Sequence, residues 1–171
     1  MILKKLRPPD YSAWNFDRDI TWFRSFNPYH KASTHYSDPD ELPGLAHFLE
    51  HMVFMGSEKF PNENSFAKFI QDNGGSYNAW TGSEHTIFFF EVQRHSFSMA
   101  LDMFSQFFIE PLMVKNAMDR EPEAVDSEFQ GYMPSDGWRL SQLFVSIAKT
   151  NHPVAKFNVG NKQSLSKVQY S

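Results

Sequence analysis

The chain has 171 residues, which fits one domain of ordinary size, and 41% of them are hydrophobic, so a substantial core can form. The formal net charge of −4 gives no general attraction to nucleic acid or to anionic membranes. The chain contains no cysteine, so disulfides and thiolate metal sites are excluded, and histidine and carboxylate side chains must hold any metal.

The N-terminal region shows no feature of a targeting signal. Charges and prolines interrupt it early, and no run in the chain approaches the roughly 18 apolar residues of a membrane span. We therefore expect a soluble, cytoplasmic protein without a membrane or nucleic-acid partner. Residues 1–36 are aromatic and basic without a clear period, and we interpret them as a divergent, irregular N-terminal segment.

The rest of the chain predicts helices and strands in an irregular order, after a turn-rich stretch, SDPDELPG, at 37–44. In chain order, the predicted elements are helices at 45–55 and 64–73, strands at 77–81 and 86–92, helices at 96–109, 115–130 and 137–149, and a loop-like tail at 150–171. This order favours an α+β fold, a partial two-layer domain in which helices pack on an antiparallel-rich sheet.

Pro122 interrupts the predicted helix at 115–130. Proline lacks an N–H and clashes with the preceding turn, at a cost of about 3 kcal/mol or more in the middle of a helix. A helix that restarts at Pro122 would avoid most of this cost. In that case Glu128 keeps its place on the helix, while Glu121 stands at the helix start and points elsewhere.

The most informative segment is His47-Phe48-Leu49-Glu50-His51, in the first predicted helix. Successive helical residues turn by about 100°, which places His51 about 40° and Glu50 about −60° from His47. The three polar side chains therefore share one face, opposite an apolar stripe that can pack into the core. Two histidines one turn apart can bind one zinc ion, and a glutamate beside them can take a proton from metal-bound water. The simpler interpretation is a solvated helix face that carries two histidines and a glutamate.

A third metal ligand must come from elsewhere in the chain. Glu121 and Glu128 lie seven residues apart in the predicted helix at 115–130, which is about two turns, so they fall on nearly the same face. One carboxylate can ligate zinc while the other accepts a hydrogen bond from a ligating histidine and orients it. The spacing of the two glutamates leaves open which of them takes which role.

These segments resemble the inverzincin metallopeptidases, the pitrilysin–insulysin–nardilysin family. The family signature is HxxEH followed after an interval by glutamate, and the 76 residues between His51 and Glu128 match that interval. The segments SDPDELPGLAHFLEHMVFMGSEKFPNENSF, NGGSYNAWTGSEHTIFFFEV and EAVDSEF also match, and the resemblance covers about residues 37–165. HMVFMGS, SEFQ, PSD and HPVAKF resemble the nardilysin branch most, whereas NAWTGSEHT is similar to the insulysin branch.

The resemblance implies a zinc-dependent endopeptidase with one zinc ion per chain and peptides as substrates. It implies that Glu50 is the general base for attack of zinc-bound water on the peptide bond. It further implies that Glu121 orients a ligating histidine without itself binding the zinc ion. It also implies that the strand beside the site binds an extended peptide by β-augmentation. The implied zinc ligands are His47, His51 and Glu128. The implied peptide-binding residues are Ser76, Asn78 and Ala79.

Two departures from the family pattern affect the expected domain limits. The family has an apolar strand before the SDP loop, where this chain has NPYHKASTHY, and family members are several times longer, with a second half that supplies further substrate-binding groups. We therefore interpret residues 37–165 as a partial zinc metallopeptidase catalytic domain and residues 166–171 as a tail. The missing C-terminal half, or a full-length relative, is an expected partner.

Three functions remain open at this point. The first is a nardilysin- or insulysin-like endopeptidase, with basic residues as a candidate cleavage preference. The alternative is a zinc-binding but catalytically inactive fragment, or a partner module of a full-length relative. The third is an interaction domain without metal that merely keeps the family sequence, and the intact HxxEH residues argue against it.

Overall fold

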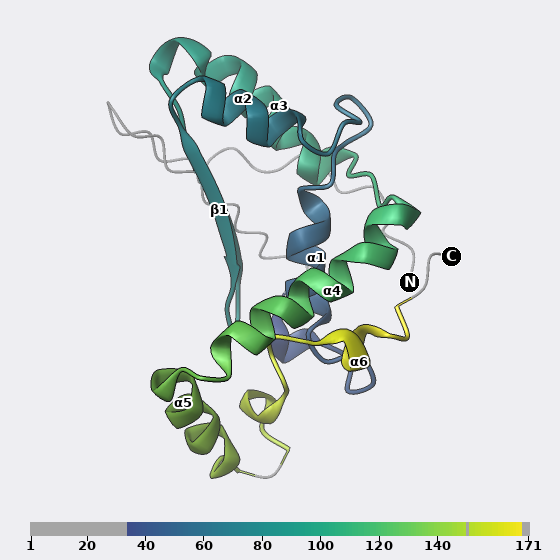
Figure 1. Cartoon of the computed structure of the whole chain (residues 1–171), viewed down its shortest axis with the longest axis vertical. Coiled ribbons are helices and arrows are strands. Elements are labelled where there is room, and N and C mark those ends of the chain that lie inside the picture. The colour runs from purple at the N-terminus through teal and green to yellow at the C-terminus, as the bar shows by residue number, and fades with distance from the viewer. Residues whose placement is uncertain (1–33, 150, 169–171) are drawn as a thin grey trace.

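A computed structural model describes residues 34–149 and 151–168 of the chain (Figure 1). Most of the predicted N-terminal segment at 1–36, and part of the predicted tail at 166–171, lie outside the described residues. The described elements, with η for a 3-10 helix, are η2 (His35–Ser37), α1 (Leu45–Val53), α2 (Ser65–Asp72), β1 (Ser76–Thr81), β2 (Thr86–Glu91), η3 (Arg94–Ser96), α3 (Phe97–Ile109), α4 (Lys115–Tyr132), α5 (Asp136–Ser146), η4 (Pro153–Ala155) and α6 (Lys162–Leu165).

Strands β1 and β2 form an antiparallel pair, and this hairpin is the sheet of the described part of the chain. Successive side chains of a strand point to opposite faces, so alternate residues enter the core. The directly opposed Ala79 and Phe88 are both buried in this way. Helices pack on this hairpin, which confirms the predicted α+β class, and α1 carries the HxxEH segment as expected.

The larger hydrophobic core lies between the hairpin and helices α2 and α3, which run side by side at one end of the molecule (Figure 1). Aromatic rings fill this core in edge-to-face contacts, such as that of Phe66 with Phe107, whose ring centroids lie 5.0 Å apart. Its buried residues are Phe66, Ile70, Ala79, Phe88, Phe90, Ala100, Met103, Phe104 and Phe107.

A smaller core joins α1, α4 and α6. Phe48 and Met52 lie four residues apart on the apolar stripe of α1, and they pack against Ala117 and Val125 of α4. Leu165 of α6 completes this cluster. The packing confirms the apolar stripe predicted for α1, and it holds the polar face of α1 next to α4.

Helix α4 is continuous from Lys115 to Tyr132 with Pro122 inside it, so the restart considered for Pro122 does not occur. Contacts on both sides of the proline offset its cost. Val125 is fully buried in the smaller core, and Glu121 is buried with one carboxylate oxygen 3.4 Å from Nδ1 of His51. Glu121 therefore points toward α1 and not away from it.

The predicted loop-like tail contains two short elements, η4 and α6. Helix α6 begins with a capping box, in which the Asn161 side chain accepts the N–H of Ser164 and the Ser164 hydroxyl accepts the N–H of Asn161. Polar composition suggested a loop, whereas this reciprocal cap and the burial of Leu165 produce a short helix.

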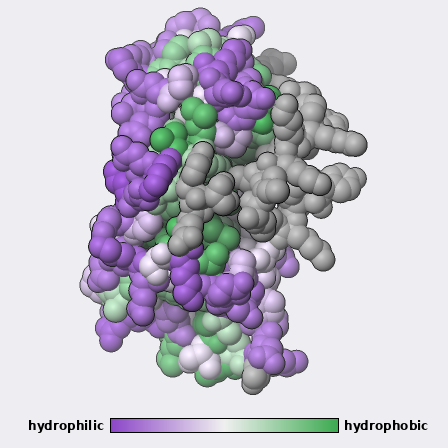
Figure 2. Space-filling view, turned by 90° about the vertical axis from the view of Figure 1, so that its right-hand side faces the viewer, coloured by the Kyte–Doolittle hydropathy of each residue, from purple (hydrophilic) through white to green (hydrophobic). Residues whose placement is uncertain are grey.

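Helix α5 presents an apolar stripe to solvent. Leu140, Leu143, Phe144 and the following Ile147 recur at helical spacing, and between 61% and 73% of each residue is exposed. Figure 2 shows hydrophobic residues at the lower end of the molecule, the end at which α5 lies in Figure 1. Among the helices of residues 34–149 and 151–168, none combines the length and apolarity needed to cross a bilayer.

Candidate metal centre

The SDP loop anchors the start of α1. The N-cap position is Gly44, which has no side chain with which to cap the helix. Asp38 provides the cap instead, because its Oδ2 accepts the Gly44 N–H at 2.9 Å and its Oδ1 accepts the Ala46 N–H at 2.8 Å. Burial raises the pKa of the Asp38 carboxyl, and the two N–H donors oppose that rise. The loop thereby holds the helix that carries the HxxEH residues.

Helices α1 and α4 bring two histidines and a glutamate together. One ligand atom from each of His47, His51 and Glu128 lies within 4.8 Å of the others. Oε2 of Glu128 is 3.3 Å from Nε2 of His47 and 3.5 Å from Nε2 of His51. These three residues, which the family resemblance implied as ligands, could together hold a metal ion.

The opposite ring nitrogens of both histidines also have partners. Nδ1 of His47 lies 2.7 Å from the carbonyl oxygen of Val159, and Nδ1 of His51 lies 3.4 Å from Oε2 of Glu121. Such acceptors favour the tautomer with the proton on Nδ1, which leaves the lone pair of Nε2 toward Glu128. Both rings are therefore oriented by a contact at Nδ1, His47 by a backbone carbonyl and His51 by a carboxylate.

Val159 reaches His47 because two glycines meet at this point. Gly44 and Gly160 have φ angles of +89° and +80°, in the region that favours glycine. A Cβ atom on Gly44 would lie 2.3 Å from Cα of Gly160, closer than any side chain allows. A larger residue at position 44 would push the segment at 158–160 away from α1, and with it the carbonyl that orients His47.

Glu50 lies beside the three residues, and only 8% of it is exposed. The Thr81 hydroxyl, at the end of β1, donates to Oε2 of Glu50 at 2.6 Å, and Thr86 donates to the Thr81 hydroxyl at 3.3 Å. Burial raises the pKa of Glu50, although Thr81 and the two histidines oppose the rise. A carboxyl with a raised pKa takes up a proton more readily, which is the property required of a general base near neutral pH.

Hydrogen bonds among these residues shift their pKa values. In their protonated form, in which Nε2 also carries a hydrogen, the two imidazoles donate to Glu128, and these hydrogen bonds hold the pKa of its carboxyl well below the usual range. Burial lowers the pKa of His47, but its bonds to Glu128 and Val159 outweigh burial, and the pKa is raised overall. On the other oxygen of Glu128, the Tyr132 hydroxyl donates at 2.5 Å, and this bond raises the pKa of Tyr132 to about 12.

Strand β1 leads away from the centre. Thr81 borders Glu50, and because a strand rises about 3.3 Å per residue, Asn78 lies about 10 Å further along it. Ser76 and Asn78 are exposed, whereas Ala79 is buried. The last residue of their strand, Thr81, contacts Glu50.

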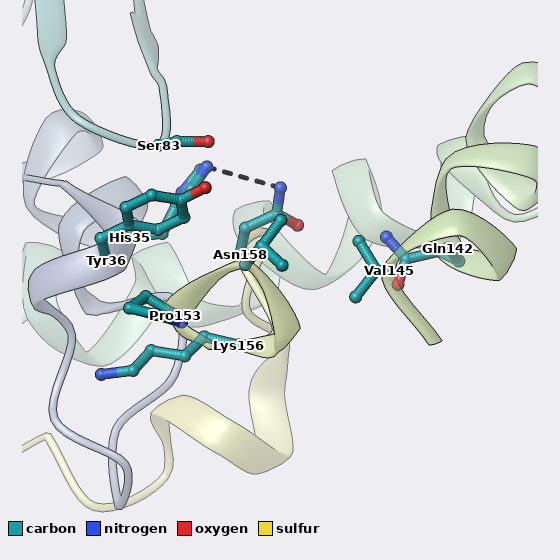
Figure 3. Close-up of a pocket in the computed structure, with 9 residues that line it drawn as sticks. His35, Tyr36, Ser83, Gln142, Val145, Pro153, Lys156 and Asn158 are labelled. Carbon is teal, nitrogen blue, oxygen red and sulfur yellow. Dashed lines mark hydrogen bonds between the residues drawn. The ribbon is translucent and has the colours of Figure 1, made fainter. Parts of the chain in front are cut away.

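A separate pocket of about 170 Å³ lies among η2, the turn after β1, α5 and the segment around η4 (Figure 3). The amide of Asn158 lies 3.5 Å from Nε2 of His35 in its wall. His35 is buried, and its Nδ1 has no hydrogen-bond partner among the described residues. The pocket is lined by His35, Tyr36, Ser83, Gln142, Val145, Pro153, Val154, Lys156 and Asn158. None of these residues belongs to the metal centre. Asn158 is linked to that centre through the next residue in the chain, Val159, whose carbonyl contacts His47.

Three residues that contact the centre were not found by sequence reasoning. Tyr132 follows Glu128 by four residues, so helical spacing could have indicated their contact. Thr81 lies in the predicted strand that the family resemblance placed beside the site, but no local pattern indicated its contact with Glu50. Val159 contributes only its backbone carbonyl, which leaves no signal in the residue type.

Comparisons with known proteins point to one family. A model of the family described as Insulinase (Peptidase family M16) matches residues 33–151. Nardilysin from Homo sapiens is 58% identical over 130 residues, which cover 76% of this chain and 11% of that protein. Insulin-degrading enzyme from Mus musculus is 46% identical over 129 residues, which cover 75% of this chain and 13% of that protein.

Structural comparison agrees. A crystal structure of pitrilysin superposes with a TM-score of 0.76 and 30% sequence identity, covering 98% of this chain and 19% of that chain. The chain spans between 11% and 13% of the length of the human and mouse relatives named above.

Proposed function

Because the chain belongs to the insulinase family of peptidases (peptidase family M16), we propose that it carries the zinc-binding catalytic centre of a metalloendopeptidase. The observation that carries this proposal is the convergence of His47, His51 and Glu128. We propose that its substrates are peptides and, more specifically, that it cleaves them at basic residues, since the chain is similar to nardilysin.

The donor atoms and their spacing support one zinc ion per chain. Zinc bonds to imidazole nitrogen and carboxylate oxygen at about 2.0–2.2 Å in a tetrahedral arrangement, which places neighbouring ligand atoms about 3.3–3.6 Å apart. Oε2 of Glu128 lies 3.3 Å and 3.5 Å from the two Nε2 atoms, so the carboxylate has the spacing of a ligand that shares one ion with each histidine. Two histidines and one carboxylate are also a donor set of catalytic zinc sites.

The surrounding residues suit peptide hydrolysis. Zinc, when bound, supplies a Lewis acid that lowers the pKa of water toward about 7. Glu50 takes the proton of the attacking water and passes it to the leaving amine as the peptide C–N bond breaks. Thr81 holds Oε2 of Glu50, which leaves its Oε1 to carry that proton. Glu121 and Val159 keep the histidine rings in place.

Strand β1 is the proposed peptide-binding element. Exposed residues Ser76 and Asn78 alternate along it, and its last residue, Thr81, contacts the proposed base. A peptide that pairs with β1 through backbone hydrogen bonds would run toward Glu50 in an extended conformation. This direction would deliver a peptide bond to the centre without requiring a preformed deep pocket.

Metal content tests the ligand set. We expect one zinc ion per purified chain and strongly reduced zinc in Glu128→Gln, because an amide oxygen is a weaker ligand than a carboxylate. Glu123→Gln is the matched control on the same helix, because Glu123 is exposed and pairs with Lys162. Equal zinc content in both variants would remove Glu128 from the proposed site.

Hydrolysis of a fluorogenic dibasic peptide then tests the reaction, with Glu50→Gln as the blank. Turnover above that blank, reduced when the basic pair is replaced, supports both the activity and the basic-site preference. Stoichiometric zinc without turnover supports the alternative proposal, that the chain is a zinc-binding fragment or a partner module without activity of its own.

A further inference from the structure

Tyr132 contacts the metal centre although it is not part of the HxxEH…Glu pattern. It is the last residue of α4 and follows Glu128 by four positions, so the two side chains lie on the same side of the helix. The Tyr132 hydroxyl donates to Oε1 of Glu128 at 2.5 Å, whereas Oε2 is the atom that faces both histidines. The two oxygens of this carboxylate therefore have separate partners.

We propose that Tyr132 is a positioning residue that makes Glu128 a one-oxygen metal ligand and so keeps one coordination position open. The proposal rests on the proposed function, because it concerns the same centre. A carboxylate can bind a metal through one oxygen or through both. Catalytic zinc sites combine three protein ligands with an open position, and the second oxygen of Glu128 would compete for that position. The phenol engages this second oxygen and turns it away from the histidines.

Glu128 needs such a partner because burial does not restrain it. Its side chain is 35% exposed, compared with 8% for the side chain of Glu121. Among the described residues, its hydrogen-bond and ion-pair partners are the two imidazoles and Tyr132. An exposed carboxylate without the phenol could rotate about its last torsion and present both oxygens.

Glu121 shows the same division between its oxygens. Arg120 donates to Oε1 of Glu121 at 3.4 Å, and Oε2 is the atom that lies near His51. A donor outside the HxxEH segment therefore holds one oxygen of each α4 carboxylate, and the remaining oxygen faces the histidines. This repeated pattern indicates that the Tyr132 contact is part of how the centre is oriented.

The junction between α4 and α5 fixes the position of Tyr132. The N–H of Ser135, the N-cap residue of α5, donates to the Tyr132 carbonyl at 2.9 Å. The Tyr132 residue is itself 38% exposed, so replacing it by phenylalanine removes a hydroxyl without opening a core cavity. Folding of Tyr132→Phe is therefore expected to be unaffected, and circular dichroism checks this.

The test loads the full chain with Co²⁺, whose visible absorption is stronger in four-coordinate than in five-coordinate sites. We expect weaker visible absorption from Tyr132→Phe, because Oε1 of Glu128 then also binds the metal. We also expect the affinity for Co²⁺ to change by about 10-fold or more, as it does for other residues that orient ligands. Tyr36→Phe is the matched control, because Tyr36 lines the separate pocket and its substitution should leave the spectrum unchanged.

The outcomes separate the two proposals. A changed spectrum in Tyr132→Phe and an unchanged one in Tyr36→Phe supports the positioning role. Identical spectra in Tyr132→Phe and the parent overturn it, even if the affinity differs, because a merely structural tyrosine would not alter coordination. Absence of Co²⁺ and Zn²⁺ binding by the parent chain would instead overturn the proposed function.

Discussion

Asp38 allows a quantitative test of how the helix that carries the metal centre is held. Asp38→Ala removes the acceptors of two backbone N–H groups, those of Gly44 and Ala46, at the start of α1. Asp38 is 4% exposed, so water has little access to the groups that the substitution leaves unpaired. Lys156 donates to the backbone carbonyl of residue 38, and the substitution keeps that bond.

The expected loss of unfolding free energy follows from these two bonds. Each buried donor left without a partner costs about 1–3 kcal/mol, and losing a helix cap costs about 1 kcal/mol. Desolvation of the Asp38 carboxylate, visible in its raised pKa, offsets part of the gain that its bonds provide. We therefore expect a loss of about 2–4 kcal/mol for Asp38→Ala, a large share of the roughly 5–15 kcal/mol that stabilises a domain. Asp38→Asn keeps one acceptor oxygen and should lose less.

Urea unfolding of the full chain, followed by circular dichroism, measures this loss. With a slope of about 2 kcal/mol per molar urea, the midpoint of Asp38→Ala should fall by about 1–2 M. Asp40→Ala is the control, because the Asp40 side chain is 90% exposed and pairs only with Lys156 among the described residues. An exposed pair of this kind contributes about 0–1 kcal/mol. Equal midpoints for Asp38→Ala and Asp40→Ala would refute the capping role.

Further predictions concern the base, the metal, the glycine contact and the peptide-binding strand. Glu50→Gln should keep one zinc ion and lose at least about 10²-fold in any hydrolysis, because an amide cannot accept the proton; turnover equal to the parent would exclude Glu50 as the base. Zinc affinity should weaken as pH falls, beginning above pH 6.5, because the raised pKa of His47 makes protons compete with the metal; calorimetry that shows constant affinity between pH 8 and pH 6 would contradict this. Gly44→Ala should lower both the melting temperature and the zinc content, because the added Cβ would clash with Gly160. An unchanged melting curve would show that residues 159–160 can move away from position 44 without loss of stability. Bound peptide should slow amide exchange across Ser76–Thr81, and measurable binding without added protection there would count against β1 as the peptide site.

Local pattern predicted the longer helices and both strands to within a few residues, but not the short elements η4 and α6. The predicted helix at 45–55 is observed at Leu45–Val53, and the predicted strands at 77–81 and 86–92 are observed at Ser76–Thr81 and Thr86–Glu91. Helical periodicity alone placed His47 and His51 on one face, because two residues one turn apart are neighbours on any helix. Such predictions succeed because they depend on residues close in sequence.

The tertiary structure decided how these elements meet. Helical spacing left the roles of Glu121 and Glu128 open, and only the packing of α4 on α1 places one against Nδ1 of His51 and the other against both Nε2 atoms. Pro122 could have ended the helix between them, and long-range burial on both sides of it kept the helix continuous. The carbonyl of Val159 reaches His47 across 112 positions of sequence, through a glycine contact that no local pattern records. These contacts depend on the relative positions of segments distant in the chain, and core packing, rather than the propensity of any one residue, sets those positions.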